Sequence, residues 1–136
     1  MSWAQSLIRI AHFEVEMLQK RLKEIGDRRA AIELVLASLD TEAEAEIANA
    51  RTSAEAGWYL AGFREGWKLR RARAEADLHA CELEEAGARD ALGEAFEAQK
   101  KYEQVAENAR LARLKMEART ETAALDELAL RITGTR

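Results

Sequence analysis

The chain has 136 residues, of which 34% are charged and 6% aromatic, and it contains no proline. This composition is typical of coiled coils and long helices, and it supplies too few aromatic side chains to fill a large compact core. A net charge of −4 argues against a general nucleic-acid binder, which is usually basic. One cysteine excludes an internal disulfide and fits a reducing compartment.

The beginning of the chain has no pattern of a membrane anchor or a secretory signal. Its first uncharged stretch covers residues 1–8 and ends at Arg9. This stretch is too short to span a bilayer, and it has neither a basic leading region nor an unbroken apolar segment. We therefore expect a cytoplasmic protein that does not insert into a membrane.

Apolar residues in the first third of the chain recur at alternating steps of four and three. A mean step near 3.5 is the repeat of a left-handed coiled coil. The pattern predicts a helix over about residues 3–50. Its seam positions, twelve of fourteen of them apolar, are Ala4, Ile8, Ala11, Val15, Leu18, Leu22, Ile25, Arg29, Ile32, Leu36, Leu39, Ala43, Glu46 and Ala50.

A turn is predicted at about residues 50–57. Thr52 followed by Glu55 fits a capping box, which begins a helix by binding its free amide groups. Gly57, Gly62 and Gly66 lower helix stability nearby and tolerate left-handed backbone conformations. The segment 62–66 is the second candidate for the turn.

Every seventh residue from Leu60 onward is apolar or aromatic, which predicts a second helix over about residues 58–132. These positions are Leu60, Trp67, Ala74, Cys81, Ala88, Ala95, Tyr102, Ala109, Met116, Ala123 and Leu130. The companion column is less regular, since Leu78 and Leu92 give way to Val105 and Ala112 on a shifted phase. We therefore expect an all-α protein in which residues 1–136 form one elongated antiparallel two-helix coiled-coil hairpin. Its alanine-rich seam buries little area, so its stability should be modest.

Folding back near residue 54 places Trp3 opposite a residue near 105, so that roughly the last 25 residues project past the N-terminus. A fresh stripe of apolar residues begins there, and an apolar stripe on an unpaired helix needs a partner. The stripe comprises Leu111, Leu114, Ala118, Leu125, Leu128 and Ile132. A second set lies off the seam of the first helix and is expected to face water, where it binds a partner, self-associates or is covered by the projecting segment: Trp3, Leu7, Ile10, Phe13 and Met17.

The residues give no support to catalysis or to a metal or cofactor site. His12 and His79 lie on different helices, and His79 and Cys81 are two residues apart, which places them on different helix faces. No glycine-rich phosphate loop, dinucleotide fingerprint or nucleophile elbow is present. We expect no enzyme and no cofactor, with Cys81 as a seam residue beside an exposed histidine.

Aromatic and basic residues gather beside the expected turn. The aromatic ones are anchors for a partner or a plug that closes the turn; they are Trp58, Tyr59, Phe63 and Trp67. The basic ones could meet nucleic acid or an acidic protein surface, or form a solvated face; they are Arg64, Lys68, Arg70, Arg71 and Arg73.

The segments 6–30 and 69–107, with the Lys100–Gln104 run and the tryptophan-containing turn, resemble the FliJ family of flagellar export proteins. The resemblance implies a central stalk that binds and stimulates the hexameric type III export ATPase. It also implies contacts with the cytoplasmic domain of the export gate and with export chaperones. Such a protein acts in the cytoplasm, peripherally at the membrane-embedded gate, and serves flagellum biogenesis, motility and chemotaxis.

Carried onto this chain, the resemblance assigns two sets of partner-binding residues. The set for the gate is Phe63, Trp67, Trp58 and Tyr59. The set for the ATPase ring is Leu7, Ile10, Phe13, Met17, Leu125, Leu128 and Ile132. The chain departs from the family in its strongly basic run after the aromatics and in its long alanine seam.

Two other functions stay open at this point. One is a structural coiled-coil scaffold or oligomerisation arm without an ATPase partner, and the other is a nucleic-acid-binding hairpin that uses Arg64–Arg73. The sequence also leaves open the oligomeric state, a monomer included, and the choice between a flagellar and a related injectisome system.

Overall fold

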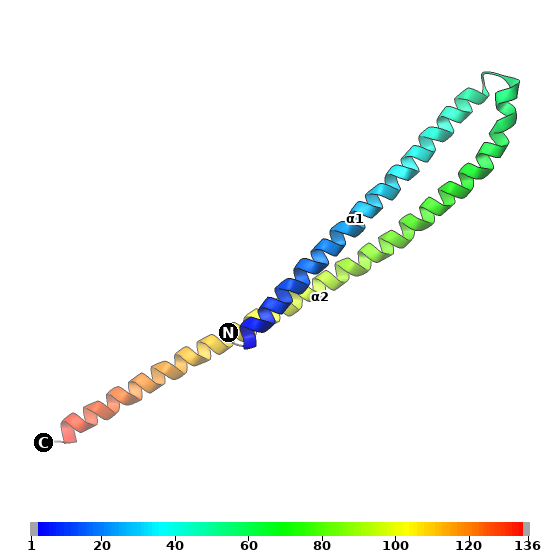
Figure 1. Ribbon diagram of the computed structural model, residues 1–136. Coiled ribbons are helices and arrows are strands. Elements are labelled where there is room, and N and C mark those ends of the chain that lie inside the picture. Colours follow the sequence, from blue (N-terminus) through cyan, green and yellow to red (C-terminus); the bar gives the residue numbers. More distant parts are fainter. Residues whose placement is uncertain (1–2, 135–136) are drawn as a thin grey trace. The chain divides into compact units, whose positions relative to one another are not determined.

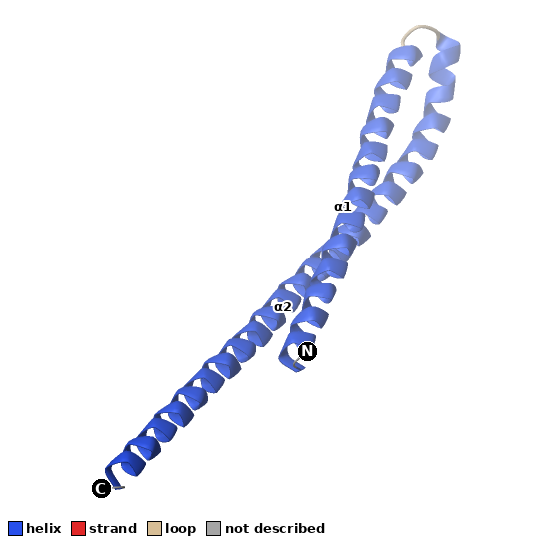
Figure 2. Ribbon diagram, turned by 60° about the vertical axis from the view of Figure 1, so that its left-hand side comes forward, coloured by secondary structure: helices blue, strands red, loops and turns tan. Residues whose placement is uncertain are grey.

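The computed structural model describes residues 3–134 as two helices joined by a short connection (Figure 1). Helix α1 covers Trp3–Ala50 and helix α2 covers Ala54–Gly134, with residues 51–53 between them (Figure 2). The described part of the chain contains no strand. Bonds between the helices run antiparallel, from Leu39 to Trp67 and from Arg29 to Glu85. This confirms the expected all-α helical hairpin.

Helix α2 begins at Ala54, four residues earlier than the sequence pattern predicts. The predicted capping box at Thr52 is wrong, because Ser53 is the residue that accepts a hydrogen bond from the Ala56 amide, at 3.1 Å. The Thr52 hydroxyl donates instead to the Asn49 carbonyl at the end of α1, at 2.6 Å. The Thr52 hydroxyl therefore caps the C-terminal end of α1, and Ser53 caps the N-terminal end of α2.

The glycines near the connection do not serve as the turn. Gly57, Gly62 and Gly66 all lie within α2, and no residue of the described part has a positive φ. The second candidate for the turn, residues 62–66, is therefore wrong. Each glycine costs the helix about 1 kcal/mol relative to alanine, which is too little to interrupt a helix of 81 residues.

The chain divides into two compact units, and each unit contains a piece of both helices. One unit comprises the residues up to Val15 together with those from Glu94 onward, and the other is Glu16–Gly93. In the second unit the most deeply buried side chains are Ile25 and Cys81, at 1% and 2% exposure. Ala88, Leu22 and Ile32 pack around them. The Cys81 thiol also donates to the Ile25 carbonyl, at 3.5 Å.

The predicted seam of α1 is confirmed. All fourteen of its positions are buried or half-buried, including the two polar ones, Arg29 and Glu46. Most other residues of α1 are exposed. The 3.5-residue period therefore identifies correctly which stripe of α1 faces α2.

The predicted seam of α2 is confirmed only in part. Its first seven positions, from Leu60 to Tyr102, are buried or half-buried, whereas the last four are exposed. The shifted companion column is wrong, because Val105 and Ala112 are exposed. The seven-residue repeat continues without a shift instead. The companion column that includes Leu78 and Leu92 also passes through Arg71, Glu85, Gln99 and Ala106, which are all buried or half-buried.

Polar residues of α2 occupy the seam because each of them bonds to a side chain of α1. Within Glu16–Gly93, Arg71 forms an ion pair with Asp40, and Glu85 accepts a hydrogen bond from Arg29 at 2.6 Å. Within the other unit, the Gln99 amide lies 3.1 Å from a ring nitrogen of His12. These contacts satisfy groups that would otherwise be costly to bury.

The contact between Arg29 and Glu85 makes stability depend on pH. The hydrogen bond from Arg29 lowers the pKa of Glu85, and a second one from Arg89, at 2.8 Å, adds to the effect. A carboxylate whose pKa is lowered by folding stabilises the protein above its unfolded pKa of about 4.3 and loses this contribution as the pH falls through the folded value. We therefore expect the melting temperature to fall on acidification below that range, and Glu85→Gln to weaken the fall.

Thermal unfolding followed by circular dichroism from neutral to acidic pH checks this expectation. Glu82→Gln is the matched control, because Glu82 is exposed and forms no ion pair in the described part of the chain. Equal acid dependence in the two variants would contradict the role given to Glu85.

Candidate partner-binding surfaces

Among residues 3–134, no three side chains of His, Cys, Asp or Glu are arranged to hold a metal ion. Cys81 is buried in the seam and His79 is exposed, as the sequence predicts. No helix in the same part of the chain is both long and apolar enough to cross a membrane. The two helices present apolar and charged patches on their surfaces.

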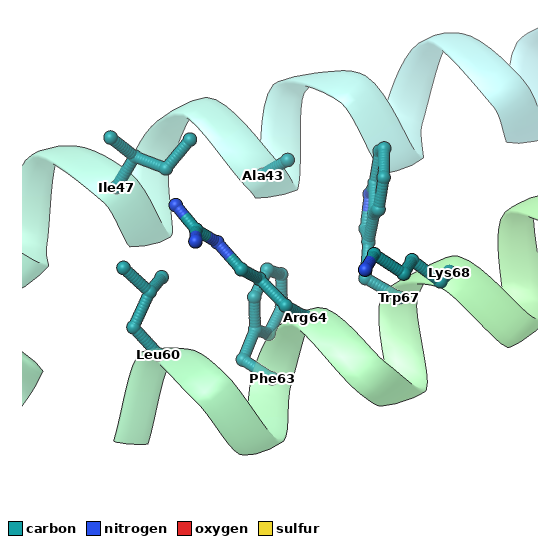
Figure 3. A pocket seen from close by; sticks show the side chains of 7 residues that line it. All are labelled: Ala43, Ile47, Leu60, Phe63, Arg64, Trp67 and Lys68. Atoms are coloured by element: carbon teal, nitrogen blue, oxygen red, sulfur yellow. The ribbon is translucent and has the colours of Figure 1, made fainter. Parts of the chain in front are cut away.

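The aromatic residues near the connection divide into two pairs, of which Phe63 and Trp67 form the inner one. Both are half-buried and line a hollow of about 280 Å³ between the helices, with Ala43 and Ile47 on its α1 side (Figure 3). The Trp67 indole N–H donates to the Leu39 carbonyl of α1, at 2.7 Å. These two rings therefore pack between α1 and α2, which is the place of a plug beside the turn.

Two further contacts hold the Trp67 ring in this position. The Arg71 guanidinium lies over its face, 5.5 Å from the ring centroid, and Arg71 also pairs with Asp40 of α1. A cation over an indole ring is attracted by the negative face of the ring. Trp67 is thus fixed on one side by α1 and on the other by an arginine of its own helix.

Trp58 and Tyr59 form the outer pair, which is open to solvent. Their exposures are 86% and 71%, among the largest of the apolar and aromatic side chains in the described chain. They line a shallow hollow with Ala54 and Glu55 at the start of α2. Large aromatic side chains are frequent anchors of protein interfaces, and here they need no rearrangement to reach a partner.

The basic run is partly used within the hairpin. Arg70 makes two hydrogen bonds to Glu42, at 3.1 and 3.3 Å, and Arg71 pairs with both Asp40 and Glu75. In the described part of the chain, Arg64, Lys68 and Arg73 form no ion pair. The sequence pattern alone did not reveal Glu42 and Asp40 as partners, because they lie 28 and 31 residues away on α1, whereas Glu75 is four residues from Arg71 on α2 itself.

Four of the five off-seam apolar residues of α1 face solvent, as the sequence predicts, and for the fifth, Leu7, the prediction is wrong. Trp3, Ile10 and Phe13, in the first unit, are 64%, 62% and 63% exposed, whereas Leu7 is half-buried. Met17, in the other unit, is 51% exposed. Trp3 lies beside Ala106, Ala109 and Arg110 at the edge of the paired region.

Helix α2 continues beyond the place where α1 begins. We call residues 111–134 the overhang. Every residue from Glu107 to Gly134 is exposed, and Arg113, near the start of the overhang, lies beside Trp3 and Gln5 of α1. Its large apolar side chains, each at least 45% exposed, are Leu111, Leu114, Met116, Leu125, Leu128, Leu130 and Ile132. An uncovered apolar set of this size marks a contact site.

No protein-family model and no solved structure gives a significant match to this chain. Two curated relatives do match, each with the name Flagellar FliJ protein, from two strains of Caulobacter vibrioides. In each case the identity is 55% over 129 residues, which covers 95% of this chain and 93% of the relative. The resemblance seen in the seam and turn segments is thus confirmed over nearly the whole chain. The chain belongs to the FliJ family of flagellar proteins.

Proposed function

We propose that this chain is a non-enzymatic component of the flagellar type III protein export apparatus, in which it binds and stimulates the export ATPase ring as a central stalk. The overhang carries the proposal, because it presents five exposed leucines on a helical segment whose residues are all exposed. A single helix that reaches beyond a two-helix pair is narrow enough to enter a ring of subunits. Burial of its leucines there would favour ring assembly.

The exposed residues at the beginning of α1 extend the proposed contact. Ile10 and Phe13 belong to the same unit as the overhang and offer two more large apolar side chains. Leu7 is half-buried beside them, and Met17 follows on the same helix. In this proposal they meet the ATPase together with Leu125, Leu128 and Ile132.

The outer aromatic pair supports a second contact, with the cytoplasmic domain of the export gate. Trp58 and Tyr59 are exposed, whereas Phe63 and Trp67 are engaged between the helices. We therefore propose Trp58 and Tyr59 as the direct anchors, with Phe63 and Trp67 supporting the surface from beneath. Handling of export chaperones and a cytoplasmic location at the gate belong to the same proposal.

A nucleic-acid-binding role for Arg64–Arg73 is less well supported. Arg70 and Arg71 are already paired with acids of α1, and a phosphate would have to displace Glu42 and Asp40. Salt-dependent binding is set by the number of phosphates that basic side chains neutralise, and few remain here.

The experiment that tests the stalk is a titration of the full chain into its cognate ATPase. We expect ATP turnover and the fraction of hexamer to rise together and to saturate, while the chain alone hydrolyses no ATP. Turnover can be followed by phosphate release and assembly by mass photometry. An ATPase whose turnover and assembly do not respond to the chain would contradict the proposal.

The gate contact is tested by two double variants. We expect Trp58→Ala with Tyr59→Ala to weaken binding to the gate domain at least about tenfold with an unchanged melting temperature, because both rings are exposed. We expect Phe63→Ala with Trp67→Ala to lower the melting temperature as well, because the second change removes the bond to Leu39.

Calorimetric titration and circular dichroism on both double variants give the two measurements. The proposal would be contradicted if Trp58→Ala with Tyr59→Ala left gate binding unchanged, while Phe63→Ala with Trp67→Ala weakened it at an unchanged melting temperature. Phe63 and Trp67 would then be the direct anchors.

A further inference from the structure

The apolar stripe of the overhang lies on a different face of α2 from the seam. The seam column reaches Met116, whereas the stripe passes through Leu114 and Ala118, two residues away on either side. At 100° per residue, roughly half a turn separates the two faces. An extension of α1 along its present path would therefore leave the stripe uncovered, and another chain must supply its cover.

The charges of the overhang are segregated along its length. Residues 111–119 carry three basic side chains and one acidic one, whereas residues 120–134 carry three acidic side chains and one basic one. Two overhangs side by side in antiparallel orientation bring the basic half of each against the acidic half of the other. In parallel orientation, like charges would face each other.

The stripe repeats with the spacing of a coiled-coil seam and is compatible with the same antiparallel pairing. With the twofold axis between Arg119 and Thr120, Leu111 lies level with Leu128 of the second copy, and Leu114 with Leu125 of the second copy. By symmetry this gives four leucine–leucine layers. These four leucines are 45–66% exposed in the isolated chain, so the pairing would remove substantial apolar area from water.

Between Ala118 and Leu125, the position that continues the spacing of the stripe is occupied by a charged residue, Glu121, and this residue selects the orientation. In a parallel pair it would meet Glu121 of the second copy, and two carboxylates in one layer repel each other. In the antiparallel pair it lies level with Ala118 of the second copy, within the basic half that contains Lys115 and Arg119. A single polar seam residue can specify the orientation of a coiled coil in this way.

We propose that the overhangs of two copies of this chain pair as an antiparallel coiled coil through Leu111, Leu114, Leu125 and Leu128. The pair covers the surface that the stalk offers to the ATPase ring. Self-association and ring binding are therefore mutually exclusive, and the dimer is a reserve form in which the apolar stripe is kept from water until the ring is available. The pairing itself requires no ATPase, so its test is independent of the proposed stalk function.

Sedimentation equilibrium of the full chain over a range of concentrations tests the pairing. We expect a reversible monomer–dimer equilibrium that Leu114→Asp with Leu125→Asp weakens at least about tenfold, because each charge would be buried in an apolar layer. The matched control is Leu34→Asp with Leu83→Asp, which changes two leucines of the other unit that are 71% and 63% exposed. Circular dichroism on each variant checks that the helices remain formed.

A charge exchange tests the contribution of these charges to the pairing without changing the four leucines. One variant makes the basic half acidic, by Arg113→Glu, Lys115→Glu and Arg119→Glu, and another makes the acidic half basic, by Glu121→Lys, Asp126→Lys and Glu127→Lys. Each variant alone should lose the dimer, because both halves then carry one sign of charge, whereas an equimolar mixture should regain it.

Three results would overturn the proposal. If the full chain stays monomeric at every concentration, no dimer forms. If a dimer persists after truncation at Arg110, its interface lies outside the overhang. A monomeric full chain whose ATPase stimulation is lost on Leu114→Asp with Leu125→Asp assigns the stripe to the ring alone.

Discussion

Truncation after Arg110 is expected to abolish the stimulation of the cognate ATPase and to leave the hairpin folded. Every described residue that the cut removes is exposed, so none of the buried seam side chains is lost. It also removes all the leucines of the overhang. Each large apolar side chain that is buried on binding contributes about 1.5–3 kcal/mol, so the loss of several lowers affinity for the ring by orders of magnitude.

The measurement combines ATP turnover with circular dichroism of the truncated chain. The melting temperature should remain within a few degrees of that of the full chain, and gate binding through Trp58 and Tyr59 should persist. Stimulation that survives the truncation, with Phe13→Ala and Met17→Ala also harmless, would refute the assignment of these ends to the ring. The variant Leu34→Ala, which changes an exposed leucine away from the overhang, should stimulate normally.

Substitution of Ile25 by alanine is expected to destabilise the hairpin more than any other single deletion in the seam. Ile25 is 1% exposed and is the largest fully buried side chain of the described chain. Replacement of a buried isoleucine by alanine costs about 2–5 kcal/mol, because apolar contacts are lost and a cavity remains. Small proteins have only about 5–15 kcal/mol of stability in total, and an alanine-rich seam offers little to compensate the loss.

Urea unfolding followed by circular dichroism measures this effect. Leu34→Ala is again the control, since Leu34 lies on the same helix at 71% exposure and should change stability by less than about 0.5 kcal/mol. Similar unfolding midpoints for the two variants would mean that the seam around Ile25 and Cys81 does not hold the second unit together.

Leucine and isoleucine side chains have two different roles in this chain. Ile25 and Leu39 are apolar residues whose partners lie in the same molecule, and Leu125 and Leu128 are apolar residues that are open to solvent. The first kind determines whether the hairpin is formed. In our proposal the second kind determines what the hairpin binds.

The helical class, the buried face of α1 and the family could all be predicted from the amino-acid sequence. A seam of 3.5-residue period is a local property, since successive residues such as Leu18, Leu22 and Ile25 fall on one side of a helix whatever lies opposite. The family follows from residues spread over nearly the whole chain, and the comparison with the relatives bears it out.

The residues of α2 that are covered, and the contacts of the polar seam residues, depend on how the two helices pack and could not be predicted. Ala95 and Met116 belong to the same seven-residue column, yet Ala95 is 5% exposed and Met116 is 66% exposed. The reason is that Met116 lies beyond the N-terminal end of α1, where no residue of α1 covers α2. Likewise, Glu85 becomes a seam residue because Arg29 lies across from it. Trp67 is engaged between the helices and Trp58 is not, because only the former reaches a carbonyl of α1. Burial and bonding of this kind depend on the register of two segments far apart in sequence, which no local period encodes.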